Sequence, residues 1–142
     1  MRVRSIVSAF AGISLYLIFQ TGCTGRTASE EIIPEKARNL AAATEFINER
    51  CPEQVDPETR MDSVTLSREG ELVFFYTLPN KEKSGINPES FTAYMLGAIV
   101  KNVRTNRDLK MHRDSSVVMK FNYRDRNGEL ITDFSLSPER YR

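Results

Sequence analysis

Apolar and polar positions recur along the chain with two different periods, which predict two helices and two β-hairpins. In residues 34–50 and 87–107, apolar side chains return every three or four positions, as they do on one face of an α-helix. In residues 63–78 and 117–136, apolar and polar positions alternate, which is typical of strands. A turn interrupts each alternating stretch, one containing Gly70 and the other Asn127-Gly128, a pair favoured in type I′ hairpin turns.

The order helix, hairpin, helix, hairpin predicts an α+β fold. We expect a four-stranded antiparallel sheet made of the two β-hairpins, with the two helices on one face (tandem helix-hairpin, αββαββ). Residues 34–137 would form this single domain and residues 138–142 a polar tail. The layout resembles the tandem αββ arrangement of the β-lactamase-inhibitor protein family, whose members bind proteins through the open sheet face, and this is an analogy at the level of fold.

The aromatic strand at residues 72–78 is apolar on both of its faces. Two helices cover only one face of a sheet, so we expect apolar side chains on the other face to stay open. A contiguous apolar surface of this kind marks an interaction site. The predicted interaction surface contains Val73, Phe75, Val118 and Lys120.

Residues 1–22 have the layout of a secretory signal peptide. Arg2 and Arg4 precede an uncharged apolar run at residues 5–19, and small residues close the segment. The run has 15 residues, whereas a helix needs roughly 20 to cross a bilayer, so a cleaved signal is favoured over a retained span. The chain is therefore expected to be exported and to work in the cell envelope.

Gly22-Cys23 resembles the end of a bacterial lipoprotein signal, in which the cysteine after a small residue is acylated and becomes the new N-terminus. Gln20 departs from that pattern, which usually has leucine three places before the cysteine. The resemblance implies a lipid such as palmitate on Cys23, a flexible tether over residues 23–33, and anchoring to the envelope, at the outer membrane on its periplasmic side or surface. If Cys23 instead stays free, a disulfide to Cys51 becomes available, and the two fates exclude each other.

Charge is balanced overall but not along the chain. The 20 Lys and Arg against 19 Asp and Glu give no support for nucleic-acid binding, which needs a basic stripe. Residues 24–100 hold 8 basic and 13 acidic side chains, whereas residues 101–142 hold 10 and 6. Either the two halves attract each other within the fold, or the C-terminal part presents a positive face to an acidic partner.

His112 and Cys51 are the candidates for chemistry, and neither has the neighbours that catalysis requires. His112 is flanked by Asp108, Asp114 and two serines, but a catalytic triad needs groups that converge in space, so we expect an exposed loop histidine. Cys51 is predicted at a helix C-terminus, where the dipole raises the pKa of a thiol, and is interpreted as a buried structural thiol. Zinc normally takes several His or Cys ligands. The sequence therefore predicts no metal, no cofactor and no enzymatic activity.

The segment between the first helix and the aromatic strand carries a second resemblance. It rests on Cys51-Pro52, Val55-Asp56, Thr59-Arg60, Asp62-Ser63 and the strand end Phe75-Tyr76-Thr77. With these residues, positions 45–136 are similar to a small exported bacterial family of uncharacterised function. Members of that family have further cysteines in the C-terminal half, and none occurs here. The resemblance implies no activity.

Two functional hypotheses follow from the sequence. The first is a non-enzymatic, envelope-anchored lipoprotein that acts as a protein-interaction module and binds another envelope protein through its sheet face or loops. The second is a carrier of a small apolar ligand in a pocket between the helices and the sheet. The small side chains at Gly97, Ala42 and Ala43 would leave room for such a pocket.

Overall fold

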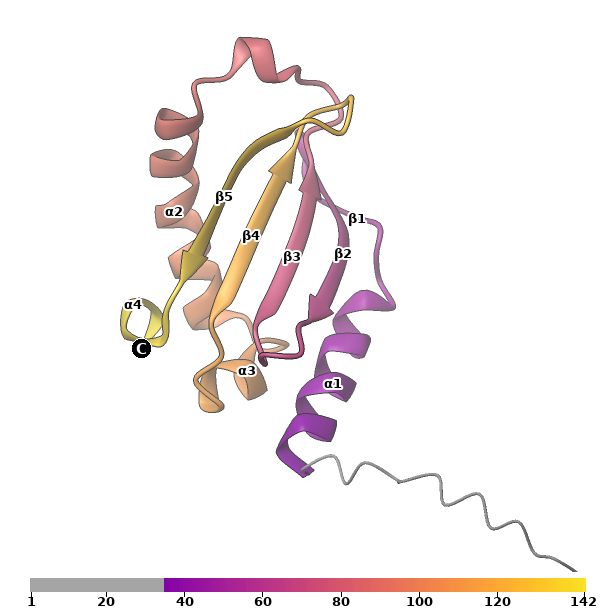
Figure 1. Cartoon of the computed structure of the whole chain (residues 1–142), viewed down its shortest axis with the longest axis vertical. Helices are drawn as coiled ribbons and strands as arrows, with labels where there is room; N and C mark the ends of the chain where they lie inside the picture. Colours follow the sequence, from indigo (N-terminus) through magenta and orange to yellow (C-terminus); the bar gives the residue numbers. More distant parts are fainter. Residues whose placement is uncertain (1–34) are drawn as a thin grey trace, which may run out of the picture. The chain divides into compact units, whose positions relative to one another are not determined.

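Residues 35–142 are described in the computed structural model, and they contain one β-sheet with helices before, within and after it (Figure 1). The predicted signal peptide, Cys23 and the tether lie outside the described residues. No described helix is long and apolar enough to span a bilayer. The helices are α1 (Glu35–Asn48), the 3-10 helix η1 (Lys83–Gly85), α2 (Pro88–Thr105), α3 (Lys110–Asp114) and α4 (Pro138–Tyr141). The strands are β1 (Glu53–Asp56), β2 (Thr59–Leu66), β3 (Leu72–Thr77), β4 (Met119–Arg124) and β5 (Leu130–Leu136).

The start of α2 follows the local signals in its sequence. The Asn87 side chain accepts a hydrogen bond from the backbone N–H of Ser90 at 2.9 Å, and Pro88 occupies the first turn. This satisfies one of the N–H groups that a helix leaves without an internal partner. The predicted helix beginning at Asn87-Pro88 is therefore confirmed, as is the alternation that predicted β2, β3, β4 and β5.

The sheet differs from the expected one in strand number and direction. It has five strands in the order β1-β2-β3-β4-β5, and β3 pairs with β4 in parallel. The prediction of four antiparallel strands was therefore wrong. The reason is the connection through α2, which carries the chain back along the sheet to the edge where β3 began, so β4 must run in the same direction as β3.

The additional strand, β1, lies in a segment that the sequence indicated as a turn-rich link. Its four residues, Glu53–Asp56, form an antiparallel pair with the start of β2. Three of the four are polar or charged and three are exposed, so the segment has no apolar alternation to reveal a strand. Its pairing partner, and not its own composition, makes it a strand.

Helix α1 packs against the part of β2 that β1 does not reach. Leu40, Thr44 and Ile47 on one face of the helix are buried. The Asn48 side chain accepts a hydrogen bond from the backbone N–H of Val64 at 3.0 Å. An N–H on the free edge of a strand would otherwise offer a site for pairing with another chain. The helix thus buries the core and closes this edge.

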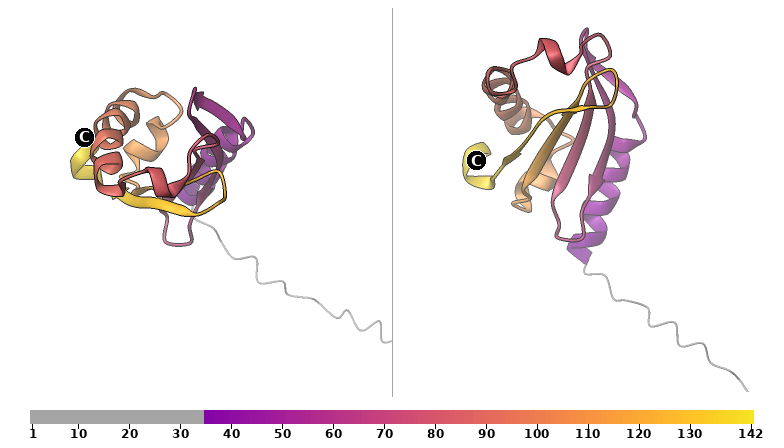
Figure 2. Two further views of the ribbon diagram at one scale, coloured as in Figure 1. Left: turned by 90° about the horizontal axis from the view of Figure 1, so that it is seen from above. Right: turned by 45° about the horizontal axis from the view of Figure 1, so that its top comes forward.

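The core lies between the helices and one face of the sheet. Figure 2 shows α2, α3 and α1 on the same side, with the opposite face uncovered. Aromatic rings of β3 and β4 stack in register, because Phe74 pairs with Phe121 and Tyr76 with Tyr123. The ring centroids are 5.1 Å and 4.8 Å apart. Such pairs contribute about 0.5–1.5 kcal/mol beyond their buried area.

His112 lies in the core and not in an exposed loop as expected. It belongs to the short helix α3 and is fully buried. Its Nε2 is 3.0 Å from the Thr44 hydroxyl, which donates its own hydrogen to the carbonyl of Leu40 at 2.8 Å. Because a hydroxyl has one hydrogen, Nε2 must carry a proton and donate it, which fixes the neutral tautomer. Within the described residues, Nδ1 has no hydrogen-bond partner.

Asp125 joins the turn between β4 and β5 to the loop that precedes α2. Its carboxylate accepts hydrogen bonds from the backbone N–H groups of Lys83, Asn127 and Glu129, at 3.0, 2.8 and 2.9 Å. These bonds lower the pKa of Asp125. In this turn Gly128 has a positive φ of 82° and Asn127 does not, so it is not the type I′ turn that the sequence indicated.

The C-terminal residues fold back onto the domain. Tyr141 in α4 is 2% exposed, and its hydroxyl donates a hydrogen bond to the carbonyl of Val117 at 2.7 Å. Helix α4 packs against α2 and β5 precedes it directly. The position of α4 is therefore fixed by a buried side chain.

The described residues 35–142 belong to one compact unit, and its buried apolar side chains extend from Leu40 to Tyr141. We predict that a polypeptide of residues 32–142 folds without the preceding segment, because that core is complete within it. Circular dichroism and tyrosine fluorescence should report one coincident thermal transition. A gradual loss of signal without a transition would contradict the prediction.

Burial lowers the pKa of His112 below 6.5 in the folded protein. Above pH 6.5 the ring is neutral in both states, so its contribution to stability is fully present. As the pH falls from 6.5 toward the lower pKa of the folded state, the unfolded state takes up the proton first and stability decreases. We predict that His112→Gln reduces this decrease, measured as the free energy of unfolding in urea between neutral and mildly acidic pH.

The matched variant is Thr44→Val, which keeps the side-chain shape but leaves the His112 N–H without its acceptor. It is expected to lower the free energy of unfolding by about 2 kcal/mol at neutral pH. An unchanged stability of Thr44→Val would show that this hydrogen bond does not hold α3 to α1. An unaltered pH profile of His112→Gln would show that the buried His112 does not cause the loss of stability at mildly acidic pH.

Candidate functional site

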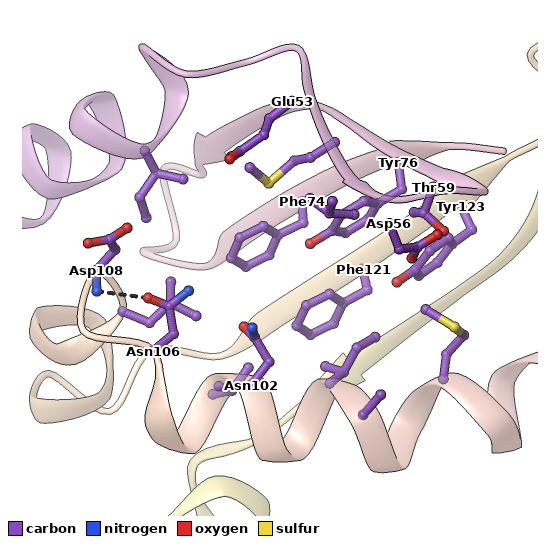
Figure 3. A pocket seen from close by; sticks show the side chains of 18 of the residues that line it. Glu53, Asp56, Thr59, Phe74, Tyr76, Asn102, Asn106, Asp108, Phe121 and Tyr123 are labelled. Carbon is purple, nitrogen blue, oxygen red and sulfur yellow. Dashed lines mark hydrogen bonds between the residues drawn. The ribbon is translucent and has the colours of Figure 1, made fainter. Parts of the chain in front are cut away.

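A groove runs between α2 on one side and the end of α1 with β1 on the other, over the concave face of the sheet (Figure 3). Its volume is about 640 Å³. At Asp56, Thr59 and Met95 it joins a second hollow of about 780 Å³, which extends along the N-terminal half of α2 past Ile86, Phe91 and Tyr94. We call the two together the α2 groove.

The floor of the α2 groove consists of four aromatic side chains from β3 and β4, namely Phe74, Tyr76, Phe121 and Tyr123. They come together because alternate residues of a strand share a face and because the two strands pair in parallel register. Burial raises the pKa values of both tyrosines, so their hydroxyls stay protonated and can donate hydrogen bonds. Figure 3 shows both hydroxyls directed into the groove.

One wall is a single face of α2. Met95, Ala98, Ile99, Asn102 and Asn106 line it, at the spacing of three and four residues that places side chains above one another. Ala98 is exposed in the groove. This small side chain leaves an opening in the wall of the groove. Gly97, Ala42 and Ala43, which the sequence indicated as the small residues beside a pocket, line neither hollow.

The opposite wall and the rims are polar. Arg50 binds Asp108 at 2.6 Å and lies 3.9 Å from Glu53, so it joins the end of α1 to the segment before α3. Lys81 pairs with Glu58 at 2.8 Å beside the second hollow. The charged residues lining the α2 groove are Arg50, Lys81, Glu53, Asp56, Glu58 and Asp108, with a net charge of −2. An apolar floor under acidic rims suits a ligand that is apolar on one side and basic at its margins.

The chemistry expected of Cys51 is limited by its surroundings. The thiol is half-buried at the end of α1, and its Sγ donates to the carbonyl of Ile47 at 3.8 Å. Burial, followed by the charge of Glu53, raises its pKa, and Arg50 offsets part of this effect. The thiol is therefore mainly protonated at neutral pH and a weak nucleophile.

The described residues bring no set of catalytic or metal-binding groups together. His112 is buried away from the groove in contact with Thr44. In residues 35–142 no cluster of three or more His, Cys, Asp and Glu side chains is placed to hold a metal ion. What the groove offers is apolar contact, hydrogen-bond donors from two tyrosines, and negative charge.

The predicted interaction surface lies on the other face of the sheet. Val73 pairs with Lys120, and Val118 precedes Lys120 by two positions, so these residues share that face with Phe75. All four side chains are half-buried, and Lys120 binds Glu71 at 2.6 Å. Their sheet neighbours are the polar residues Thr65, Ser63, Asn122, Ser135 and Asp133. The apolar part of this face therefore consists of Val73, Phe75 and Val118 with polar side chains around them, and its role as an interaction surface stays a prediction.

The groove residues were visible in the sequence as core positions but not as a site. Met95, Ile99 and Val103 belong to the apolar face expected of α2, and the aromatic floor was expected in strands. The groove exists because β1 extends the sheet on one side and α1 stands apart from α2. No local pattern encodes that separation.

Solved structures with this fold come from secreted and secretion-associated bacterial proteins. The type 2 secretion system pilotin EpsS of Vibrio vulnificus gives a TM-score of 0.57 at 17% identity, over 76% of this chain and 96% of that chain. The pilotin AspS of Vibrio cholerae gives 0.56 at 16%, over 75% and 95%. A Pseudomonas aeruginosa protein described as secreted gives 0.57 at 9%, over 78% and 99%. At these identities the similarity shows the fold alone.

Sequence comparison gives the family. No curated protein sequence matches the chain. Residues 35–131, from the first residue of α1 into β5, match the model of a family described as Domain of unknown function (DUF8479). This match covers more than half of the sequence, and the chain therefore belongs to the DUF8479 family.

Proposed function

We propose that this protein is a non-enzymatic, envelope-anchored lipoprotein whose α2 groove binds a segment of another envelope protein. The observation that carries the proposal is the groove that follows α2, whose floor is lined by Phe74, Tyr76, Phe121 and Tyr123. Tyr76 is half-buried, and the other three rings are buried. The pilotin fold of the structural neighbours and the lipoprotein-type signal ending at Cys23 support a place in the envelope, next to a component of a secretion system.

The shape of the groove favours a protein segment over a small molecule. The two hollows of about 640 and 780 Å³ are continuous and open to solvent, and α2, with its 18 residues, is about 27 Å long. Small-molecule sites are more enclosed and bury most of the ligand surface. A partner segment with apolar residues on one face would cover the floor, and basic residues at its margins would meet Glu53, Asp56 and Asp108.

A carrier of a small apolar ligand is the second candidate. The same aromatic floor favours it, because stacked rings are a good surface for an apolar molecule. In that case the ligand would fill the first hollow without engaging the charged rims. The two candidates predict different occupants of one site.

A substitution that fills the groove tests ligand binding separately from the stability of the protein. Ala98 is exposed within the groove, and Ala93 is exposed on the same helix outside it. Ala98→Trp is expected to block the groove while changing the free energy of unfolding by less than about 0.5 kcal/mol, as surface substitutions do. Ala93→Trp is the matched control.

The measurement uses a photoreactive amino acid at Asn102, in the full chain produced in cells of the source organism. We expect a crosslinked adduct with one envelope protein, reduced at least about tenfold by Ala98→Trp and retained in Ala93→Trp. Absence of a protein adduct, together with a bound small molecule in native mass spectrometry that Ala98→Trp removes, would replace the proposal by the carrier function. Equal adducts from both variants would contradict both.

The proposed anchor is tested separately. The intact mass of the protein extracted from membranes is expected to correspond to a chain that begins at Cys23 and carries acyl groups. Cys23→Ser is expected to remove the acyl mass and release the protein from membranes at high salt. A mass that includes residues 1–22 in the wild-type protein, or a disulfide between Cys23 and Cys51, would contradict lipidation.

A further inference from the structure

The C-terminal excess of positive charge gathers on one surface of the domain. It comes from the last turns of α2, from α3 with its flanking residues, and from α4. Residues 101–116 and 137–142 hold seven basic and three acidic side chains, a net charge of +4. We call this the basic surface, and its members are Lys101, Arg104, Arg107, Lys110, Arg113, Arg140 and Arg142.

Hydrogen bonds to the backbone hold these three segments together. Arg113 donates to the carbonyls of Val103 and Asn106 at 2.7 and 2.5 Å, which fixes α3 beside the end of α2. Arg104 donates to the carbonyl of Arg140 at 3.1 Å, which joins α2 to α4. Because Tyr141 is also buried, the backbone segments that carry the cations are fixed relative to one another.

The local acidic groups neutralise only part of this surface. Asp108 pairs with Arg50, which is not a member of the surface, and Asp114 pairs with Lys110. Glu139 is exposed and makes no salt bridge within residues 35–142. Among the described residues, Lys101, Arg107 and Arg140 make no salt bridge. The negative end of the α2 dipole accounts for the cations of its last turn. The dipole does not account for Arg140 and Arg142, because Arg140 belongs to α4 and Arg142 directly follows it, and both lie beside the cations of α2.

An exposed apolar side chain lies on α3, one of the segments that carry the basic surface. Met111 in α3 is 43% exposed, while its neighbours Leu109 and His112 are buried. It sits between Lys110 and Arg113 in the sequence. Basic side chains around an exposed apolar one are typical of surfaces that lie on membranes, where the cations bind headgroups and the apolar group enters the interface.

The orientation of the domain favours the same partner. In Figure 1 the first residues of α1, helix α3, helix α4 and the C-terminus all lie toward one end of the domain. The chain therefore enters the domain at the end that carries the basic surface. Twelve residues, 23–34, precede α1, a distance of at most about 40 Å when extended, so an anchor at Cys23 would keep this end close to a membrane.

We propose that the basic surface binds anionic lipid headgroups. The site is distinct from the α2 groove. The orientation argument rests on the proposed anchor, whereas lipid binding itself does not, because every residue of the surface lies within 101–142. Attraction between the surface and anionic lipid is expected to weaken with salt, since exposed charges are screened over about 10 Å at 0.1 M ionic strength.

The test uses the polypeptide of residues 32–142, which lacks Cys23, once its cooperative unfolding has been verified. Vesicles of phosphatidylcholine alone are compared with vesicles containing about 30% phosphatidylglycerol, by flotation at about 0.1 M and about 0.5 M salt. We expect binding to the anionic vesicles at low salt, its loss at high salt, and no binding to phosphatidylcholine. Equal binding to both kinds of vesicle, or none to either, would overturn the proposal.

The variant for the surface is Lys101→Gln with Arg107→Gln and Arg140→Gln, because these three side chains make no hydrogen bond or salt bridge within residues 35–142. Each cation near an anionic surface contributes about a fivefold gain in affinity, so the triple variant should bind roughly a hundredfold more weakly. The control removes the same charge elsewhere, with Lys83→Gln, Arg124→Gln and Arg126→Gln. If the control loses as much affinity, binding follows net charge and the assigned surface is wrong.

A fluorescent probe tests contact directly. The chain has no tryptophan, so Met111→Trp and Tyr94→Trp each introduce a single reporter. Tyr94 is 80% exposed on the other half of α2. Anionic vesicles should shift the emission of the Met111→Trp protein to shorter wavelength and leave that of Tyr94→Trp unchanged. A shift at position 94 and none at 111 would show that another face meets the membrane.

Discussion

The parallel pairing of β3 with β4 is the constraint on which the rest of the structure depends. It places Phe74 beside Phe121 and Tyr76 beside Tyr123, so that four rings cover the concave face of the sheet. The pairing requires a connection that returns along the sheet, and α2 with α3 supplies it. The same helix therefore closes the core and forms one wall of the groove above the rings.

Two surfaces of opposite charge result from this arrangement. The α2 groove has acidic rims, and the basic surface at the end of α2 carries seven cations. One explanation for the uneven distribution of charge along the chain is that its two halves attract each other within the fold. This explanation applies to individual ion pairs such as Arg50 with Asp108. It does not apply to the cations of α2 and α4, which adjoin each other. Positive and negative side chains are therefore partly separated onto two different surfaces, and are not only paired with each other inside the fold.

The groove, and not the fold, points to the function of this protein. Pilotins and a secreted protein share the architecture at 9–17% identity, and one fold supports many functions. A groove with an aromatic floor, tyrosine hydroxyls and charged rims has the features that the proposed binding of a protein segment requires. Within residues 35–142 the groove holds no activated nucleophile, because the pKa of Cys51 is raised and His112, on α3, is buried against Thr44 of α1.

The sequence by itself determined the elements whose signals are local. The Asn87-Pro88 start, the apolar face of α2 and the alternation in β2 to β5 are properties of adjacent residues, and the structure agrees with them. Only the tertiary structure decided the direction of β4, the existence of β1, the burial of His112 and the position of the groove. These depend on which distant segments meet: Glu53 with Met61, Thr44 with His112, β3 with β4. Such pairings are selected by the packing of the whole core, and no periodicity in a single segment specifies them.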